Sequence, residues 1–205
     1  MCSSDLVDRR TKDGKAAYEA FTSSLQPGVT VLSAEEAAES LLIASAAKGC
    51  ITRHGFKFKA TELMFLTTYM EANIKAAIDA VGEDGYLYDL KTTAEEATAK
   101  GFGRNLIWSD DYKLQAAWYM LLWKLNFGER PKGFRFVVVE KEPPFLTAVF
   151  EMHPDLIAEG ETLMLSAIKS FEVCKSFNEW PSYPTEVITI ARPQSTAPMA
   201  PINFA

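Results

Sequence analysis

Two aspartates and a lysine lie on either side of a short cluster of glycine and acidic residues. Residues 74–81 and 86–92 are rich in β-branched and aromatic residues, which predicts two strands joined by a tight turn. Asp79 belongs to the first strand, and Asp89 and Lys91 belong to the second. If these three side chains converge, they could bind a divalent cation and support hydrolysis of a phosphodiester.

The register of this hairpin decides whether the side chains converge. If residues 84–85 formed a two-residue turn, Asp89 would point to the other side of the sheet from Asp79. If residues 83–85 form a three-residue loop, with Gly85 supplying a positive φ, Asp79 lies opposite Asp89. Side chains alternate along a strand, so Lys91 would then share a face with Asp89.

Two facing carboxylates repel each other unless a cation lies between them, and oxygen ligands with room for water suit Mg²⁺. The ion would polarise a phosphate and acidify a water molecule, while Lys91 would hold or deprotonate that water. An equally simple alternative is a cross-strand ion pair between aspartate and lysine on a solvated sheet face.

Polar residues after the hairpin extend the candidate site. Thr92 and Thr93 could donate hydroxyl groups to phosphate oxygens, and Arg104, in an expected flexible loop at 101–105, could contact a phosphate. Gln115 and Tyr119 are four residues apart in an expected helix opened by Asp110 or Asp111 and running to about Phe127, so they share one face.

Asp79, the run Asp89-Leu90-Lys91-Thr92-Thr93 and the Q-x-x-x-Y pair Gln115 and Tyr119 together resemble the core of the PD-(D/E)xK nucleases. In particular, the pattern is similar to the RecE-type exonucleases, which comprise exodeoxyribonuclease VIII and its phage relatives. The resemblance covers roughly residues 7–190 and includes the stretches 8–15, 136–144 and 180–183.

This resemblance implies an α/β fold with a PD-(D/E)xK nuclease-like mixed central sheet flanked by helices. It implies an exonuclease that uses Mg²⁺ or Mn²⁺ and digests linear double-stranded DNA from 5′ to 3′, in phage-type recombination. The implied catalytic residues are Asp79, Asp89, Lys91, Gln115 and Tyr119; the implied metal ligands are Asp79, Asp89 and the Leu90 carbonyl; Thr92, Thr93 and Arg104 would contact DNA. The implied partners are DNA ends, a RecT-type single-strand annealing protein and further copies of the chain in a ring.

Two departures from the family pattern keep other functions open. Ala77 stands where relatives commonly carry an arginine two residues before the aspartate, and the upstream segment with an active-site histidine is not found in this sequence. The alternatives are a catalytically weak remnant that binds DNA ends and a different PD-(D/E)xK enzyme that cuts as an endonuclease. His54 has no partner at metal-site spacing and is a weak replacement for the histidine.

Composition fits a single globular domain outside the membrane. The 205 residues are 48% hydrophobic and 23% charged, and no apolar run approaches the length of a membrane span. Neither a signal peptide nor a paired cysteine pattern is found, so we expect a cytoplasmic protein with reduced cysteines. The net charge of -6 argues against a general nucleic-acid coat protein but not against a nuclease with a local basic groove.

Three parts of the chain are expected. Residues 1–6, MCSSDL, match the translation of a common sequencing adapter, so we expect a leader that is not native. Residues 7–192 form the nuclease-like domain, lacking its N-terminal segment, and the proline-rich residues 193–205 form a loose tail.

Pattern and capping signals predict the remaining elements. Ser33 and Glu36 form a capping box for a helix up to Gly49, and Glu62 lies in a strand at 61–70, either facing DNA or a metal-bound water or simply solvated at a sheet edge. Further helices are expected at 15–23, 94–100 and 155–177, and a second strand pair at 133–140 and 145–150.

Overall fold

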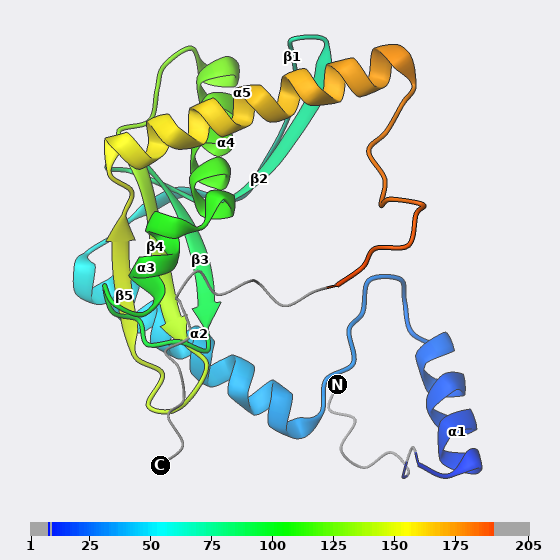
Figure 1. Cartoon of the computed structure of the whole chain (residues 1–205). Coiled ribbons are helices and arrows are strands. Elements are labelled where there is room, and N and C mark those ends of the chain that lie inside the picture. The colour runs from blue at the N-terminus through cyan, green and yellow to red at the C-terminus, as the bar shows by residue number, and fades with distance from the viewer. Residues whose placement is uncertain (1–7, 9, 191–205) are drawn as a thin grey trace, which may run out of the picture.

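The computed structural model describes residue 8 and residues 10–190, and the expected leader and tail lie outside these residues. Five helices and five strands follow each other along this part of the chain (Figure 1). The helices are α1 (Lys12–Ser23), α2 (Ala34–His54), α3 (Phe102–Trp108), α4 (Asp110–Phe127) and α5 (Pro154–Phe177), and the strands are β1 (Phe58–Tyr69), β2 (Ala72–Gly82), β3 (Tyr86–Thr93), β4 (Gly133–Glu140) and β5 (Thr147–Glu151).

The strands form one mixed sheet in the order β1-β2-β3-β4-β5. Neighbouring strands are antiparallel except for β3 and β4, which are parallel and are joined through α3 and α4. A parallel pair needs such a crossover, and the helices of the crossover cover one face of the sheet. The α/β class and the mixed sheet flanked by helices are therefore confirmed.

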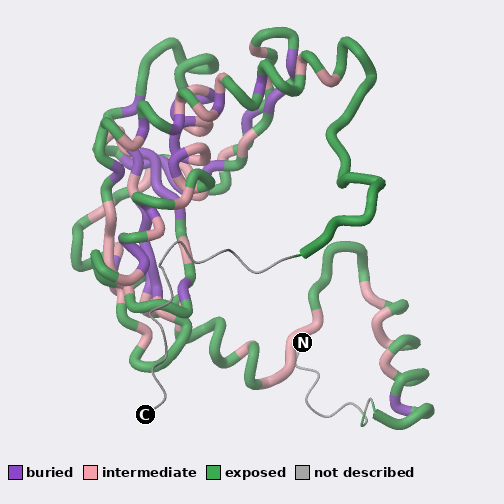
Figure 2. Tube along the Cα trace, in the orientation of Figure 1, coloured by how far each residue is buried: buried purple, intermediate pink, exposed green. Residues whose placement is uncertain are grey.

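Two hydrophobic clusters lie on the two faces of the sheet. The larger cluster joins α4 to the sheet, and its fully buried members include Leu87, Leu122 and Phe134. The smaller cluster joins Cys50 of α2 to Tyr88 and Val137. Figure 2 shows the buried residues gathered in the sheet and in α4, whereas α1 and the chain after α5 are largely exposed.

Helix α2 is longer than its sequence pattern predicts. The capping box is confirmed, because Ser33 and Glu36 exchange both of its hydrogen bonds, but the helix continues past Gly49 to His54. Its end is at Gly55, in the left-handed conformation at φ +66. The sequence pattern predicts that the helix ends at Gly49, yet the turn that follows buries Cys50 against the sheet, and this packing outweighs the intrinsic cost of an internal glycine.

The segment after β3 also differs from the prediction. Residues 94–100 form bends and turns rather than a helix, and the stretch predicted as a flexible loop at 101–105 instead begins α3. Phe102 and Leu106 are buried one turn apart, which explains why the helix forms there. Ser109 caps α4 by accepting a hydrogen bond from the Asp111 amide, so Asp110 and Asp111 lie in the first turn rather than at the cap.

Strands β1 and β2 form a long arm. Their pairing continues to Tyr69 and Ala72, whereas β2 pairs with β3 only through Ala80–Tyr88 and Val81–Leu87. Beyond these two pairs, β2 turns away from β3, and the indole of Trp118 in α4 donates a hydrogen bond of 3.0 Å to the Lys75 carbonyl.

Helix α5 packs along α4, as expected for a helix that covers the core. Ile157, Met164 and Ile168 are its buried apolar side chains. In the part of the chain that the structure describes, no helix has the length and apolar character needed to span a bilayer.

Candidate active site

The β2–β3 hairpin has the register in which the two aspartates approach each other. The two paired positions extrapolate to Asp79 opposite Asp89, and Gly85 has φ +87, so the three-residue loop is confirmed. At Asp79 the ladder has ended, and its Oδ2 accepts a hydrogen bond of 2.8 Å from the Leu90 amide. The candidate site therefore lies at the point where the two strands diverge.

Asp89 is a buried carboxylate, with only 3% of the residue exposed. Its Oδ1 accepts a 2.6 Å hydrogen bond from Nε2 of Gln115, and its Oδ2 lies 2.6 Å from Nζ of Lys91. Burial raises the pKa of this carboxyl, although Lys91 and Gln115 oppose the rise and Asp79 adds to it. The contact with Lys91 is an ion pair without hydrogen-bond geometry, so Oδ2 has no hydrogen-bond donor among the described residues.

These atoms fit a small oxygen-preferring cation, although they form an incomplete shell. In a strand, the N–H and C=O of one residue point to the same side, so the Leu90 carbonyl faces the same gap as its amide. Asp79 keeps one oxygen free of the Leu90 amide, and the Asp89 Oδ2 is engaged only by the ion pair with Lys91. No group of three or more His, Cys, Asp or Glu residues suited to a metal occurs in the described ranges, so water would have to complete the coordination.

A pocket of about 310 Å³ opens beside these residues. Asp79, Asp89 and Leu90 line it together with Ile51 of α2 and Glu62 of β1. Glu62 has φ +50, and the β1–β2 register skips the position where it would face Asp79. Glu62 is thus an exposed charge that lines the same pocket as the two aspartates.

The predicted DNA contacts have different environments. Thr92 is exposed, but Thr93 is buried, and its hydroxyl accepts a hydrogen bond from the Glu95 amide. Arg104 is exposed on α3.

Tyr119 lies one helical turn from Gln115, and its ring packs against that of Phe134, with 5.9 Å between the two ring centres. No contact between Tyr119 and the carboxylates is found in the described structure, whereas Gln115 reaches Asp89 directly. His54 stacks on Phe56, and His153 caps α5, so neither histidine joins the aspartates.

Arg135 was not predicted as a residue that supports the site. Its Nη1 donates to Asp84 in the hairpin loop and to the Tyr88 hydroxyl, both at 2.8 Å, and its Nε donates to Glu151 at 3.0 Å. The guanidinium also lies 3.5 Å from the ring centre of Tyr86. This arginine fixes the loop that sets the hairpin register, and its only sequence signal is a single cation within the apolar run 134–139.

The fold and the site define the class. A mixed sheet with an aspartate on one hairpin strand and D-x-K on the next has the architecture of PD-(D/E)xK nucleases. The profile of the family described as PDDEXK-like domain of unknown function (DUF3799) matches residues 17–192, and this chain belongs to that family.

The fold is shared with a solved structure. The structure of a candidate exonuclease from Eubacterium rectale superposes with a TM-score of 0.59 at 12% identity, covering 88% of this chain and 71% of the other. The alkaline exonuclease of Laribacter hongkongensis gives a TM-score of 0.44 at 18% identity, over 87% and 91% of the two chains. No curated protein sequence matches this chain at a significant level.

Proposed function

We propose that the protein is a metal-dependent exonuclease that degrades linear double-stranded DNA from 5′ to 3′. The observation that carries this proposal is the convergence of Asp79, Asp89 and Lys91 at the diverging end of one hairpin, with Gln115 bonded to Asp89. Two carboxylates, one of them buried, and a lysine held at such short range are typical of sites that bind a cation and handle a phosphate.

Each residue has a defined task in this proposal. Asp79, Asp89 and the Leu90 carbonyl would hold Mg²⁺ or Mn²⁺, which when bound supplies polarisation of the phosphate and acidification of water. Lys91 would hold the attacking water through its ammonium, which lies at the buried Asp89 carboxylate; to take the proton of that water it would first have to give up one of its own. Gln115 orients Asp89. Tyr119, Thr92, Thr93 and Arg104 would contact the DNA strand. The Thr93 hydroxyl accepts from the Glu95 amide and keeps its own proton to donate, but this residue is buried and would have to become accessible.

The wider setting follows from the same resemblance. The domain would comprise residues 7–192, act in the cytoplasm on DNA ends and cooperate with a RecT-type annealing protein in phage-type recombination. A ring of several copies around DNA would explain how a chain with net charge -6 stays on its substrate.

A single assay separates this function from its alternatives. Linear and closed circular duplexes are incubated with the protein and Mg²⁺, and the exonuclease degrades only the linear DNA, from its 5′ ends. Cleavage of circles would identify an endonuclease. Retarded but intact linear DNA would identify the weak end-binding remnant, which the small Ala77 at a position usually basic in relatives favours.

Substitution tests the residue assignments. Asp79→Ala and Asp89→Ala should each abolish hydrolysis, and Lys91→Ala should lower the rate by at least about 10²-fold. Mg²⁺ should raise the unfolding temperature of the wild type, since a ligand that binds only the folded state stabilises it, and this shift should disappear in both Asp variants. Glu142→Gln, at an exposed loop carboxylate, is the control that should keep the rate and the shift. Near-normal activity of Asp89→Ala would contradict the proposed site.

A further inference from the structure

The outer edge of β1 is an open strand edge. β1 is the first strand of the sheet, and β2 is its only partner strand in the described part of the chain. Natural edge strands are protected by charges, prolines or covering elements. Between the positive-φ residues Glu62 and Met70, however, the β1 sequence LMFLTTY contains neither a charge nor a proline.

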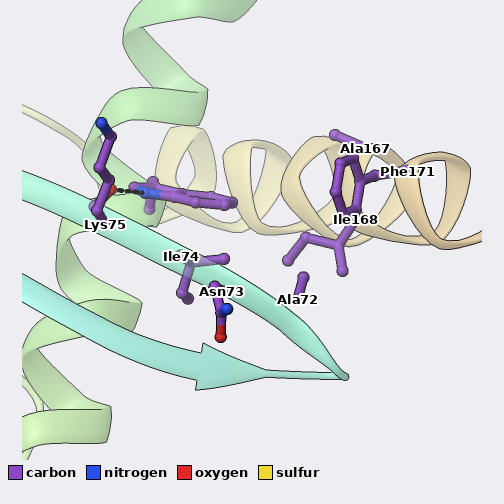
Figure 3. A pocket seen from close by; sticks show the side chains of 8 residues that line it. Ala72, Asn73, Ile74, Lys75, Ala167, Ile168 and Phe171 are labelled. Carbon is purple, nitrogen blue, oxygen red and sulfur yellow. Dashed lines mark hydrogen bonds between the residues drawn. The ribbon is translucent and has the colours of Figure 1, made fainter. Parts of the chain in front are cut away.

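The hydrogen-bonding groups that face outward on this edge can be identified. In an antiparallel pair, two opposite residues either exchange both of their hydrogen bonds or neither. The Lys75 carbonyl accepts a hydrogen bond from the Trp118 indole, the dashed line in Figure 3, on the side away from β1. Its pairing partner Leu66 therefore also directs its N–H and C=O away from β2. Because backbone direction alternates with period two, Met64 and Thr68 present their groups on the same outer edge.

The side chains along this edge are apolar and exposed. Met64 is 79% exposed and Leu66 is 76% exposed. Phe65, between them, points to the other face and is buried against Trp123 and Phe127. One face of the arm therefore packs against α4. The outer edge of β1 and the face that carries Met64 and Leu66 are exposed and can bind an extended segment.

The chain after α5 carries such a segment. Residues 183–190, YPTEVITI, contain five β-branched residues and one charge, which is the composition of a strand, and their proline, Pro184, stands at the start, where a strand tolerates it. They form no helix or strand, and Val187 and Ile190 are 97% and 87% exposed. Burying one such side chain contributes about 1.5–3 kcal/mol, so a partner for this segment would be strongly favoured.

We propose that residues 183–190 of one copy of this chain add as a strand to the outer edge of β1 in a second copy. In Figure 1 the chain that follows α5 runs away from the β1–β2 arm instead of returning along β1. Strand addition of this kind combines backbone hydrogen bonds at the open edge with side-chain burial on its apolar face. The segment that is added and the strand edge that receives it are different surfaces, so the contact is head to tail. Repeated contacts of this kind either close into a ring of copies or extend into an open filament.

The test uses two complementary variants of the full chain. Met64→Lys with Leu66→Lys places charges on the acceptor edge, and Val187→Pro with Ile188→Pro removes two adjacent amides from the donor segment. Sedimentation of the wild type should show concentration-dependent multiples of the 22.8 kDa chain, and each variant alone should sediment as the monomer. Both variants should keep the unfolding temperature of the monomeric body, because the changed side chains are exposed.

Mixing the two variants gives the decisive result. The segment variant retains a working edge and the edge variant retains a working segment, so together they should form a 1:1 dimer that grows no further. Ser182→Pro, outside the segment, should leave the wild-type association unchanged. A monomeric wild type, a mixture that fails to pair, or association that survives the segment prolines would each overturn the proposal. The readout is mass, so failure here is distinct from failure of the nuclease assignment.

Discussion

Asp89 combines a requirement of the proposed chemistry with a cost to folding. Burial raises the pKa of this carboxyl, so the folded state binds more protons than the unfolded state between the ordinary value of 3.8 and the raised one. The free energy of unfolding therefore falls as pH rises through that window, and at neutral pH the ionised carboxylate destabilises the metal-free protein.

Asp89→Asn should therefore stabilise the metal-free protein while abolishing hydrolysis. We expect a gain of about 1 kcal/mol at pH 7, or about 2–4 °C in unfolding temperature, because the buried charge is removed. The difference should vanish below the ordinary carboxyl pKa, where Asp89 is protonated in both states. Calorimetry of both proteins at pH 7 and at acidic pH measures this, and an equal or lower unfolding temperature at pH 7 would show that Lys91 fully compensates the burial.

Gln115 should affect both the rate and its dependence on pH. Its hydrogen bond to Asp89 lowers the pKa of that carboxyl, so Gln115→Ala should raise the pKa further and move the acidic limb of the rate profile to higher pH. Loss of the orienting bond should also reduce turnover. Gln115 is partly buried, so we expect its replacement to cost about 1 kcal/mol of stability.

The rate of hydrolysis as a function of pH, measured for the wild type and Gln115→Ala together with thermal unfolding, tests whether Gln115 orients Asp89. Gln115→Glu is a matched variant: a like charge at Asp89 should raise its pKa more than alanine does. A large loss of stability with no movement of the acidic limb would make Gln115 a structural residue.

At the scale of the elements, α4 and α5 are held at one close contact. Gly160 of α5 lies over the backbone of α4, and a Cβ built at this glycine would lie 2.1 Å from the Lys113 carbonyl oxygen. Gly160→Ala should therefore force the helices apart and destabilise the fold by at least about 2 kcal/mol. Gly49→Ala in α2 is the matched control.

At Gly49 a Cβ would meet only the end of the flexible Arg53 side chain, at 3.4 Å. The alanine should thus stabilise α2 by about 0.5–1 kcal/mol, because alanine has the higher helix propensity. Chemical denaturation of the two variants gives opposite signs if this account is right. Equal effects would mean that the α4–α5 contact is looser than its geometry indicates.

Local sequence patterns predicted most of these elements but not how they meet. The three-residue loop could be predicted because Gly85 supplies the positive φ. The start of α2 could be predicted because the capping box of Ser33 and Glu36 is local in sequence. The end of α2 could not be predicted, since Cys50 is buried by tertiary packing against the sheet, which local sequence does not show. For the same reason the sequence indicated a shared face for Gln115 and Tyr119, but not that only Gln115 would reach Asp89.

At the scale of the whole molecule, α1 stands apart from the sheet (Figure 1). Gly14 is its only buried residue, and neither hydrophobic cluster includes a residue before Cys50. A variant lacking residues 1–28 should therefore keep the unfolding temperature of the sheet and its helices within about 2 °C. Thermal unfolding of the shortened and full chains measures this, and a larger drop would mean that α1 contributes to the stability of the body.

The hydrogen bond from the Leu90 amide to Asp79 makes one backbone proton a reporter of the site. This proton is bonded to a side-chain carboxylate of β2 instead of a backbone carbonyl, so its NMR resonance should shift when Asp79 gains a proton or shares its charge with a cation. Its exchange with deuterated solvent should slow as the carboxylate becomes fixed. A single labelled leucine would thus follow cation loading in solution without substrate and without any change to the side chains that carry the chemistry.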